Sequence, residues 1–336
     1  MENINMEAEG MGSRIVFKGK GQVGFESFEV RKPGAEEVLI KTTCSLMSTG
    51  TENIVLNRIF EPGTAWDGWV KYPFYPGYSS VGVVKELGEN VKILEKGDRI
   101  ICRCGHSSEH VLPAYGCVKI PNGISDEDAS WFVFAKIAAM GARAAKHKLG
   151  ETLIVVGAGP IGQMSVRWAA AAGAGRIICV DPFEKRLNPA LKGGADFAIG
   201  KGIGEAIPEI LRLTDGEMAD TVIDTTGHPA VFAECFKAAR KFGKIVILGD
   251  TGTPSKQCLS HDVMGKGLTI VAAHDSHETP DWNSKKIIGL LFNLALKERF
   301  SLDGLITHQF KADRCEEAYE TANTRRNETI GILFKW

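Results

Sequence analysis

The sequence predicts an α/β protein with two domains, one rich in β-strands and one built on a doubly wound parallel sheet. A chain of 336 residues is long for a single compact core and suits two domains. Residues 14–120 consist of short β-branched runs separated by Gly, Pro or Asn, without a long helical period. From about residue 127, wholly apolar strands alternate with helices, a pattern typical of a parallel sheet covered on both faces.

The β-rich region is preceded by residues 1–13, a polar and acidic stretch that we expect to form a loose tail. It has neither the basic start nor the apolar segment of a signal peptide. Four later runs predict strands of an irregular, mostly antiparallel domain. They are RIVFKG (14–19), EVLIKTTCS (37–45), SSVGVVKELG (79–88) and DRIICRC (98–104).

The second region opens with a predicted apolar helix over residues 128–149. The strand TLIVV (152–156) then runs into a glycine turn and an alanine-rich helix, and RIICV (176–180) forms the next strand. The same alternation continues with three more strands and the helix between the first two of them. These elements are ADTVID (219–224), HPAVFAECFKAARKFG (228–243), GKIVILG (243–249) and LTIVAA (268–273). An amphipathic helix over 284–300 and a mixed segment follow.

Composition excludes several classes of protein. Lys and Arg total 40 against 41 Asp and Glu, a net charge of −1, so the chain lacks the basic excess of a nucleic-acid-binding protein. No apolar run reaches the roughly 20 residues that span a bilayer, so we expect no membrane partner. The eight cysteines are mostly far apart and no signal peptide is recognised, which predicts free thiols in the cytoplasm.

A glycine-rich motif between the first parallel strand and its helix is the strongest functional signal. Its residues are Gly157, Ala158, Gly159, Pro160, Ile161 and Gly162. With an acidic residue, Asp181, at the end of the next strand, this is the full context of a dinucleotide-binding turn. The first glycine allows the tight turn, the second lets the backbone approach the pyrophosphate, and the third lets the helix pack against the strand. The helix N-terminus offers free N–H groups to the phosphates.

Asp181 favours NAD over NADP as the cofactor. Its carboxylate would accept hydrogen bonds from the adenosine ribose and repel a 2′-phosphate. The cations Lys185 and Arg186 lie close by in the sequence and soften this preference. The alternative is a glycine-rich turn of a doubly wound fold that binds nothing.

The order of these parts resembles the medium-chain dehydrogenase/reductase superfamily over residues 14–336. GDRI before residue 101, the segment from Gly227 to Gly249 and LITHQFKADRCEEAYE (305–320) add to the resemblance. It implies a GroES-like catalytic domain over 14–128 and 278–336, with a Rossmann domain inserted over 129–277. CSLMSTGTE (44–52) and YPFYPGYSSVGVV (72–84) look most like the branch of bacteriochlorophyllide a dehydrogenase and related sugar or polyol oxidoreductases.

The resemblance also extends the predicted cofactor site beyond the glycine motif. It adds residues that follow the second, third, fourth and fifth predicted strands of the Rossmann sheet. They are Pro182, Arg186, Thr226, Gly227, Leu248, Gly249 and His274.

The chain departs from the zinc enzymes of this superfamily at all three positions of the catalytic metal ligands. Ser48 or Thr49 stands in place of the cysteine, Tyr78 in place of the histidine, and the third ligand falls near Phe134. A catalytic zinc needs about three N, S or O protein ligands, so we expect no zinc. The four-cysteine structural zinc lobe is also missing. Cys102, Cys104, His106 and His110 form the remaining metal-like cluster, for which two small residues on an inner β-face are the simpler interpretation.

Without zinc, another group must stabilise the oxygen of the reacting alcohol or ketone. By the resemblance, Tyr78 points into the cleft, and Lys136 on the neighbouring helix would lower its pKa and complete an acid/base unit. Glu52 matches a second-sphere acid and would pair with Lys136 or hold a substrate hydroxyl. Ser48 and Thr51 are candidate relay hydroxyls. Each has a structural alternative: a core aromatic ring, a salt-bridged lysine, a plain ion pair, or turn capping.

The sequence thus predicts an NAD-dependent, zinc-independent oxidoreductase that interconverts a secondary alcohol and a ketone. A loop of aromatic rings, from Trp66 to Tyr75, suits a small hydroxyl-rich or cyclic substrate. Two alternatives remain open: a quinone or enoyl reductase of the same fold, and a non-catalytic sensor that binds NAD(H). We expect a homodimer, because the strand at 268–273 would lie at a sheet edge and pair across a two-fold axis.

Overall fold

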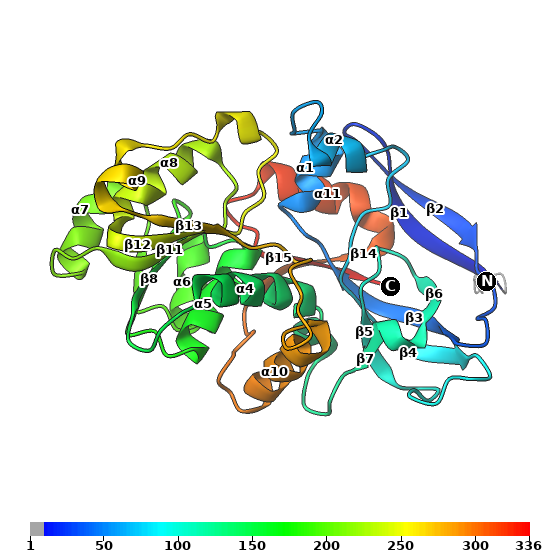
Figure 1. Ribbon diagram of the computed structural model, residues 1–336. Coiled ribbons are helices and arrows are strands. Elements are labelled where there is room, and N and C mark those ends of the chain that lie inside the picture. The colour runs from blue at the N-terminus through cyan, green and yellow to red at the C-terminus, as the bar shows by residue number, and fades with distance from the viewer. Residues whose placement is uncertain (1–9) are drawn as a thin grey trace.

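The structure, a computed structural model, describes residues 10–336 as two domains side by side, a parallel-sheet domain and a β-rich domain (Figure 1). Most of the predicted tail, residues 1–9, lies outside the described residues. The predicted tail extends too far, because its last three residues, 11–13, already belong to strand β1 (Met11–Gly19). The Ser13 N–H donates to the Ser108 hydroxyl at 2.9 Å, so this end is fixed to the body of the protein.

The parallel-sheet domain has the strand order β10-β9-β8-β11-β12-β13, and every neighbouring pair is parallel. Its strands are β8 (Thr152–Val156), β9 (Arg176–Val180), β10 (Phe197–Ile199), β11 (Ala219–Asp224), β12 (Ala239–Ile247) and β13 (Thr269–Ala272). The central strands are buried apolar runs, as a sheet covered on both faces requires. Strand order reverses between β8 and β11, so this is the predicted Rossmann topology, whose ligands bind at that switch point.

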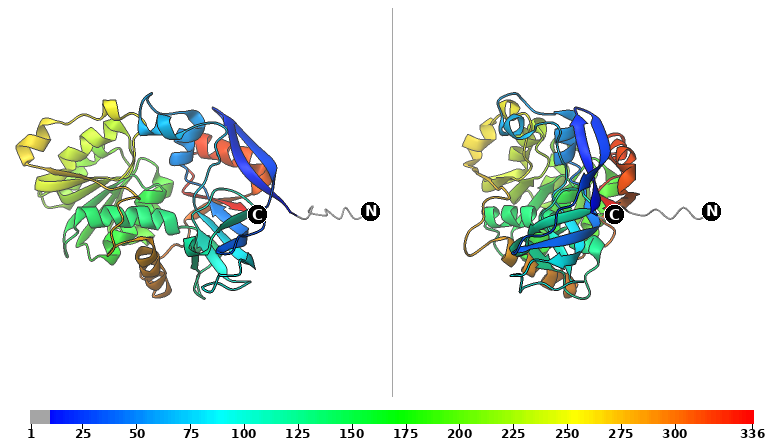
Figure 2. Two further views of the ribbon diagram at one scale, coloured as in Figure 1. Left: turned by 45° about the vertical axis from the view of Figure 1, so that its right-hand side comes forward. Right: turned by 90° about the vertical axis from the view of Figure 1, so that its right-hand side faces the viewer.

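Helices cover both faces of this sheet, as Figure 2 shows. On one face Met164, Trp168 and Leu187 share a core with the inward side chains of β8 and β9. On the other face Ile210 and Phe236 pack against the opposite side chains of the same strands. The helices of this domain are α4 (Phe132–Ala145), α5 (Pro160–Ala171), α6 (Glu184–Lys192), α7 (Ile203–Leu213), α8 (Pro229–Ala238) and α9 (His261–Lys266).

The β-rich domain contains a seven-stranded sheet and the separate hairpin β1-β2. Six strands of the sheet form one path, and the seventh, β6, pairs with β3. The main path runs β14-β15-β3-β4-β5-β7. Its strands are β2 (Gln22–Glu29), β3 (Glu37–Leu46), β4 (Ser80–Leu87), β5 (Arg99–Cys102), β6 (Glu109–Pro113), β7 (Cys117–Lys119), β14 (Ile306–Lys311) and β15 (Gly331–Lys335). The helices near it are α1 (Thr51–Asn57), α2 (Ala65–Trp69), α3 (Asp126–Ala129), α10 (Ser284–Leu296) and α11 (Cys315–Thr324). Short 3₁₀ turns occupy Ala114–Gly116, Pro254–Lys256 and Ala312–Arg314.

The seven-stranded sheet joins segments far apart in the sequence, because the C-terminal strand β15 lies between β14 and β3. Helix α10, which the predicted boundary at residue 278 assigns to the β-rich domain, contributes Ile287 and Leu291 to the core that contains α4. It therefore packs against the parallel-sheet domain rather than on the seven-stranded sheet.

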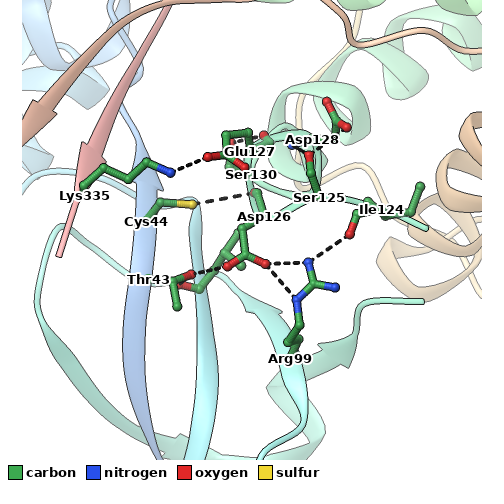
Figure 3. A network of polar contacts seen from close by, with 11 residues as sticks. Thr43, Cys44, Arg99, Ile124, Ser125, Asp126, Glu127, Asp128, Ser130 and Lys335 are labelled. Atoms are coloured by element: carbon green, nitrogen blue, oxygen red, sulfur yellow. Dashed lines mark hydrogen bonds and ion pairs between the residues drawn. The ribbon is translucent and has the colours of Figure 1, made fainter. Parts of the chain in front are cut away.

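A polar network fixes the point at which the chain leaves the β-rich domain (Figure 3). Asp126, at the start of α3, accepts hydrogen bonds from Thr43 Oγ1 at 2.6 Å and Arg99 Nε at 2.9 Å. Arg99 also donates to the Ile124 carbonyl, and Lys335 pairs with Glu127. The network thus ties β3, β5 and β15 to the segment that leads into α4.

Candidate active site

The glycine turn after β8 has the geometry of a dinucleotide cradle. Gly157 has a φ of +92°, which only glycine adopts without strain. A Cβ on Gly162 would lie 1.8 Å from the Gly157 carbonyl oxygen, so helix α5 approaches the strand more closely than a side chain allows. Gly159 is the N-cap of α5 and Pro160 its first residue, which leaves the N–H groups of the first turn directed away from the helix. These residues fit the phosphates of a nicotinamide cofactor.

Asp181 follows β9 and is bound to the glycine turn itself. Its Oδ2 accepts the Ala158 N–H at 2.7 Å and its Oδ1 accepts the Phe183 N–H at 2.8 Å. Arg186 Nη1 lies 3.7 Å from Oδ2 and partly balances the charge. The carboxylate therefore sits beside the cradle, where the ribose of the cofactor is expected, while it also fixes the turn.

Arg186 links the cofactor half of the site to the β-rich domain. Its Nε donates to the Thr329 carbonyl at 3.1 Å and its Nη2 to the Arg326 carbonyl. Burial lowers the pKa of its guanidinium, and Asp181 opposes this shift.

The remaining predicted cofactor residues lie at the carboxyl ends of β9, β11, β12 and β13. Pro182 follows Asp181, and Thr226 donates through its N–H and hydroxyl to Asp224 Oδ1. A Cβ on Gly249 would lie 2.3 Å from the Gly227 nitrogen, so the loops after β11 and β12 touch through their backbones. Leu248 packs against Gly141 of α4. His274 follows β13, and its Nδ1 bonds the Ser276 hydroxyl at 2.7 Å.

Thr225 was not predicted from the sequence, although it holds the floor of the cradle. Its hydroxyl donates to the Val156 and Gly157 carbonyls at 2.9 and 3.1 Å. Thr225 could have been found from the sequence, because it directly follows a predicted strand of the parallel sheet and precedes the predicted Thr226.

The opposite side of the site is formed by the β-rich domain around Tyr78. Gly77 has a φ of +91°, and a Cβ there would clash with the His106 ring at 2.8 Å, so the chain turns tightly over His106 just before Tyr78. The Tyr78 hydroxyl donates to Ser48 Oγ and lies 3.5 Å from Thr51 Oγ1. The structure thus brings together three of the predicted catalytic residues.

The pKa of the Tyr78 phenol is raised. Burial is the largest cause, and Glu52 adds to it, while the hydrogen bonds with Ser48 and Thr51 and the nearby Arg103 oppose it. The Arg103 guanidinium lies 5.6 Å from the centre of the Tyr78 ring. The phenol is therefore protonated at neutral pH.

Lys136 does not pair with Tyr78 or with Glu52, in contrast to the predicted acid/base unit. Its buried ammonium bonds Asp275 at 2.9 Å and Glu278 at 2.5 Å, both on the segment after His274. Asp275 also pairs with Arg103, so Tyr78 and Lys136 are connected only through Arg103 and Asp275. The two carboxylates offset the cost of burying the Lys136 ammonium among the apolar residues of α4.

Glu52 is the centre of a different, buried network. It is 2% exposed and accepts hydrogen bonds from the Ser48 N–H at 2.7 Å and from Tyr319. His106 Nε2 lies 3.2 Å from its Oε2, and His106 Nδ1 bonds Ser45. Glu52 thus braces the turn that carries Ser48. Sequence reasoning missed Tyr319 and the role of His106, because helix α11 and the loop between β5 and β6 meet α1 only through the fold.

The two domains also touch beside this site. A Cβ on Gly252 would lie 1.9 Å from the Ile59 carbonyl, and the Glu61 N–H donates to the Gly252 carbonyl at 2.8 Å. Ser255 bonds the Glu61 carboxylate. The loop after β12 therefore contacts the segment that follows α1. Among the predicted aromatic residues, Trp66 is buried, and the Tyr72 hydroxyl donates to the Val55 carbonyl at 2.6 Å.

The residues at the three metal positions do not fit a zinc ion. Phe134 has no donor atom, and its ring lies 6.0 Å from that of Tyr78, whose phenol holds its proton. Within residues 10–336, no group of three His, Cys, Asp or Glu side chains is arranged to hold a metal. The same described residues contain no helix long and apolar enough to cross a membrane.

Comparisons with known proteins agree with this architecture. Residues 34–144 match the family model of the alcohol dehydrogenase GroES-like domain, and residues 160–284 match that of the zinc-binding dehydrogenases. An L-threonine 3-dehydrogenase from Bacillus licheniformis is 28% identical, over 91% of this chain and 94% of its own.

Solved structures share the fold over nearly the whole length. An alcohol dehydrogenase from Escherichia coli CFT073, complexed with NADH, has a TM-score of 0.79 at 22% identity, covering 97% of this chain and 100% of its own. A zinc-binding dehydrogenase from Sinorhizobium meliloti 1021, bound to NADP, has a TM-score of 0.81 at 18% identity, covering 97% and 99%. The chain is thus an oxidoreductase of the alcohol-dehydrogenase kind, and it belongs to the medium-chain dehydrogenase/reductase superfamily.

Proposed function

We propose that this protein is an NAD-dependent, zinc-independent oxidoreductase that interconverts a secondary alcohol and a ketone on a small hydroxyl-rich or cyclic substrate. The observation that carries the proposal is the hydroxyl cluster of Tyr78, Ser48 and Thr51. By the family resemblance, Ser48 and Tyr78 stand at sequence positions where zinc-dependent relatives carry metal ligands, and the cluster consists of groups that donate hydrogen bonds.

NAD would be held by the glycine turn, by Asp181 and by the loops after β11, β12 and β13, and it supplies the hydride acceptor or donor. Asp181 supports NAD over NADP, because a 2′-phosphate would meet a carboxylate. The same carboxylate is occupied by two backbone N–H groups and lies near Arg186, so its preference is electrostatic rather than steric.

Tyr78 is the proposed proton donor. When a hydride reaches a carbonyl carbon, negative charge develops on the oxygen, and a protonated phenol within hydrogen-bond reach neutralises it. Ser48 accepts the Tyr78 hydrogen bond and orients the phenol. Burial raises the pKa of Tyr78, so the phenol holds the proton that ketone reduction requires, whereas alcohol oxidation requires the phenolate as base.

Lys136 and Glu52 take supporting roles in this proposal. Lys136 holds Asp275, which in turn holds Arg103 over the Tyr78 ring. Glu52 fixes the Ser48 backbone. The proposal also retains a homodimer, and it retains a location in the cytoplasm, where free cysteines such as these are the rule.

The test is a screen of ketones, alcohols, sugars and polyols by NADH fluorescence, with chelator-treated protein and metal analysis of the same sample. We expect turnover with NADH after chelation and well under one zinc per chain. Turnover that disappears with chelation and returns with zinc would overturn zinc independence. Activity confined to NADPH and quinones or enones would favour the alternative reductase, and NADH binding without any turnover would favour a sensor.

A further inference from the structure

Three thiols gather on the outer strands of the β-rich domain, outside the machinery proposed above. Cys102 ends β5 and is 1% exposed, and Cys117 begins β7 directly opposite it. Cys104, half-buried, packs against the same apolar cluster. All three are free thiols.

The backbone brings the thiols close enough for disulfide chemistry. The Cys104 N–H donates to the Cys102 carbonyl at 3.0 Å, a contact two residues apart that closes a γ-turn and draws the two Cα atoms together. On the neighbouring strand, the Ile120 N–H bonds the Arg99 carbonyl at 2.9 Å. Strand alternation therefore makes Cys102 and Cys117 a non-hydrogen-bonded pair, whose Cα atoms lie about 4.5 Å apart, within the range of disulfides.

The surroundings distinguish Cys104 from the other two. A hydrogen bond with Cys102 lowers the pKa of the Cys104 thiol, burial opposes this, and His110 on β6 lowers it further. The same bond and burial raise the pKa of Cys102, while burial raises that of Cys117. One partly exposed thiolate thus lies beside two buried thiols, the arrangement of redox-sensitive cysteines.

We propose that this cluster is a peroxide-oxidisable site, in which Cys104 is the nucleophile and Cys102 completes a reversible disulfide with it. The Cys104 sulfur attacks hydrogen peroxide, the O–O bond breaks, and a sulfenic acid and one water form. The Cys102 sulfur then attacks the sulfenic sulfur, the S–O bond breaks, and the hydroxyl leaves as a second water with the thiol proton. Two thiols are oxidised by two electrons, and the peroxide is reduced to two waters.

The disulfide would act on the site through Arg103, which lies between the two cysteines. Arg103 pairs with Asp275 and covers the Tyr78 ring. Closing a ring between residues 102 and 104 changes the backbone that aims this side chain.

Peptide mapping of the full-length protein tests the proposal without any turnover assay. After treatment with peroxide and alkylation, trypsin cleaves at Arg99, Arg103 and Lys119, so Cys102 and Cys104 fall on different peptides. We expect fragments 100–103 and 104–119 to be joined, with Cys117 alkylated, and to separate after dithiothreitol. Joined fragments in which Cys104 is alkylated instead would pair Cys102 with Cys117 and overturn the role of Cys104. A disulfide inside fragment 104–119 would instead pair Cys104 with Cys117 and overturn the assignment of Cys102. Free thiols at both positions after excess peroxide would overturn the site.

Variants assign the two roles. Cys104→Ser should abolish the linked peptide, and Cys102→Ala should leave a sulfenic acid at Cys104 that dimedone traps. The exposed Cys258 provides the control, because Cys258→Ser should leave the linked peptide unchanged. In the unmutated protein, iodoacetamide at pH 6 should label Cys104 at least about tenfold faster than Cys258, since only a thiolate reacts. Equal labelling rates would contradict the choice of Cys104 even if a variant fails to fold.

Discussion

The two sides of the active site are built by different means. On the cofactor side, backbones make the site: Gly162 and Gly249 sit where a Cβ would overlap a neighbouring chain segment, and Asp181 binds main-chain N–H groups. On the side of the β-rich domain, side chains make the site, with Tyr78 on Ser48 and Glu52 beneath them. A site built from backbone tolerates no added atom at its glycines, whereas a site built from side chains can exchange one chemistry for another within the same fold.

The first prediction removes the proposed proton donor and leaves the cofactor side intact. Tyr78→Phe should lower turnover by about 100-fold, the scale of lost general acid catalysis, with little change in NADH affinity. Steady-state kinetics and NADH fluorescence titration measure the two effects. Tyr115→Phe is the matched control, because it removes the hydroxyl of an exposed tyrosine outside the site and should leave turnover unchanged. Unchanged turnover in Tyr78→Phe would remove Tyr78 from the mechanism.

The second prediction adds one atom to the backbone-built side. In Gly162→Ala the new Cβ meets the Gly157 carbonyl at 1.8 Å and pushes α5 off the strand. Overpacking of this kind costs about 1–3 kcal/mol, so we expect the NADH dissociation constant to rise by about 10- to 100-fold. Gly289→Ala on α10, where nothing lies within 4 Å, should leave NADH binding unchanged. If Gly162→Ala binds NADH as tightly as the unmutated protein, the close contact of α5 with the strand is not needed for cofactor binding.

The third prediction separates charge from geometry at Asp181. Asp181→Asn keeps one oxygen for the Ala158 N–H, loses the acceptor of the Phe183 N–H and removes the negative charge. The lost hydrogen bond affects both cofactors alike, so the loss of charge should improve NADPH affinity relative to NADH by about tenfold. Paired fluorescence titrations measure the ratio. If the ratio stays constant, or if the unmutated protein already binds both cofactors equally, the electrostatic argument for NAD fails.

The fourth prediction concerns the ion network beside the cofactor, and its effect is the smallest. Burial raises the pKa of Glu278, but bonds from Lys136 and Ser284 outweigh burial and bring it to about 2. Because the folded pKa is depressed, Glu278 stabilises the fold above the ordinary carboxyl pKa of about 4.3 and loses this contribution as the pH falls toward 2. In Glu278→Gln, the free energy of unfolding measured with urea should therefore fall less steeply between pH 4.5 and about 2 than in the unmutated protein. Glu320 is exposed, so Glu320→Gln should show the same pH dependence of unfolding free energy as the unmutated protein. If Glu278→Gln also shows that same dependence, Glu278 is not the group that loses its contribution in this pH range.

The cofactor side was accessible to sequence reasoning because its signals are local. Strand, glycine turn, helix and acidic residue follow one another between residues 152 and 181, and each has a physical reason to be what it is. The alternating strands and helices likewise predicted the parallel sheet. Some details differ. The short strand β10 was not predicted, and the helix predicted over 228–243 ends at Ala238, and strand β12 begins one residue later. At the domain edges, β1 begins at Met11 and α10 packs against α4.

The other side was only partly accessible, because its contacts join distant segments. Tyr78, Ser48 and Thr51 were predicted and do converge, since the resemblance placed them at one site. The partners of Lys136 were not predicted. A buried lysine requires a carboxylate, but the sequence does not show which carboxylate the fold brings to it. Asp275 and Glu278 reach it from a loop more than a hundred residues away, and Tyr319 reaches Glu52 from α11.

The position of β15 sets the order in which these sides arise during synthesis. The parallel-sheet domain is one continuous stretch of chain, so the ribosome completes its glycine cradle while β3 still lacks β15 as its neighbour. Tyr319 and the strand beside β3 come later, and only then does Glu52 gain its last donor. A newly made chain therefore acquires a place for the nucleotide before it acquires a place for chemistry.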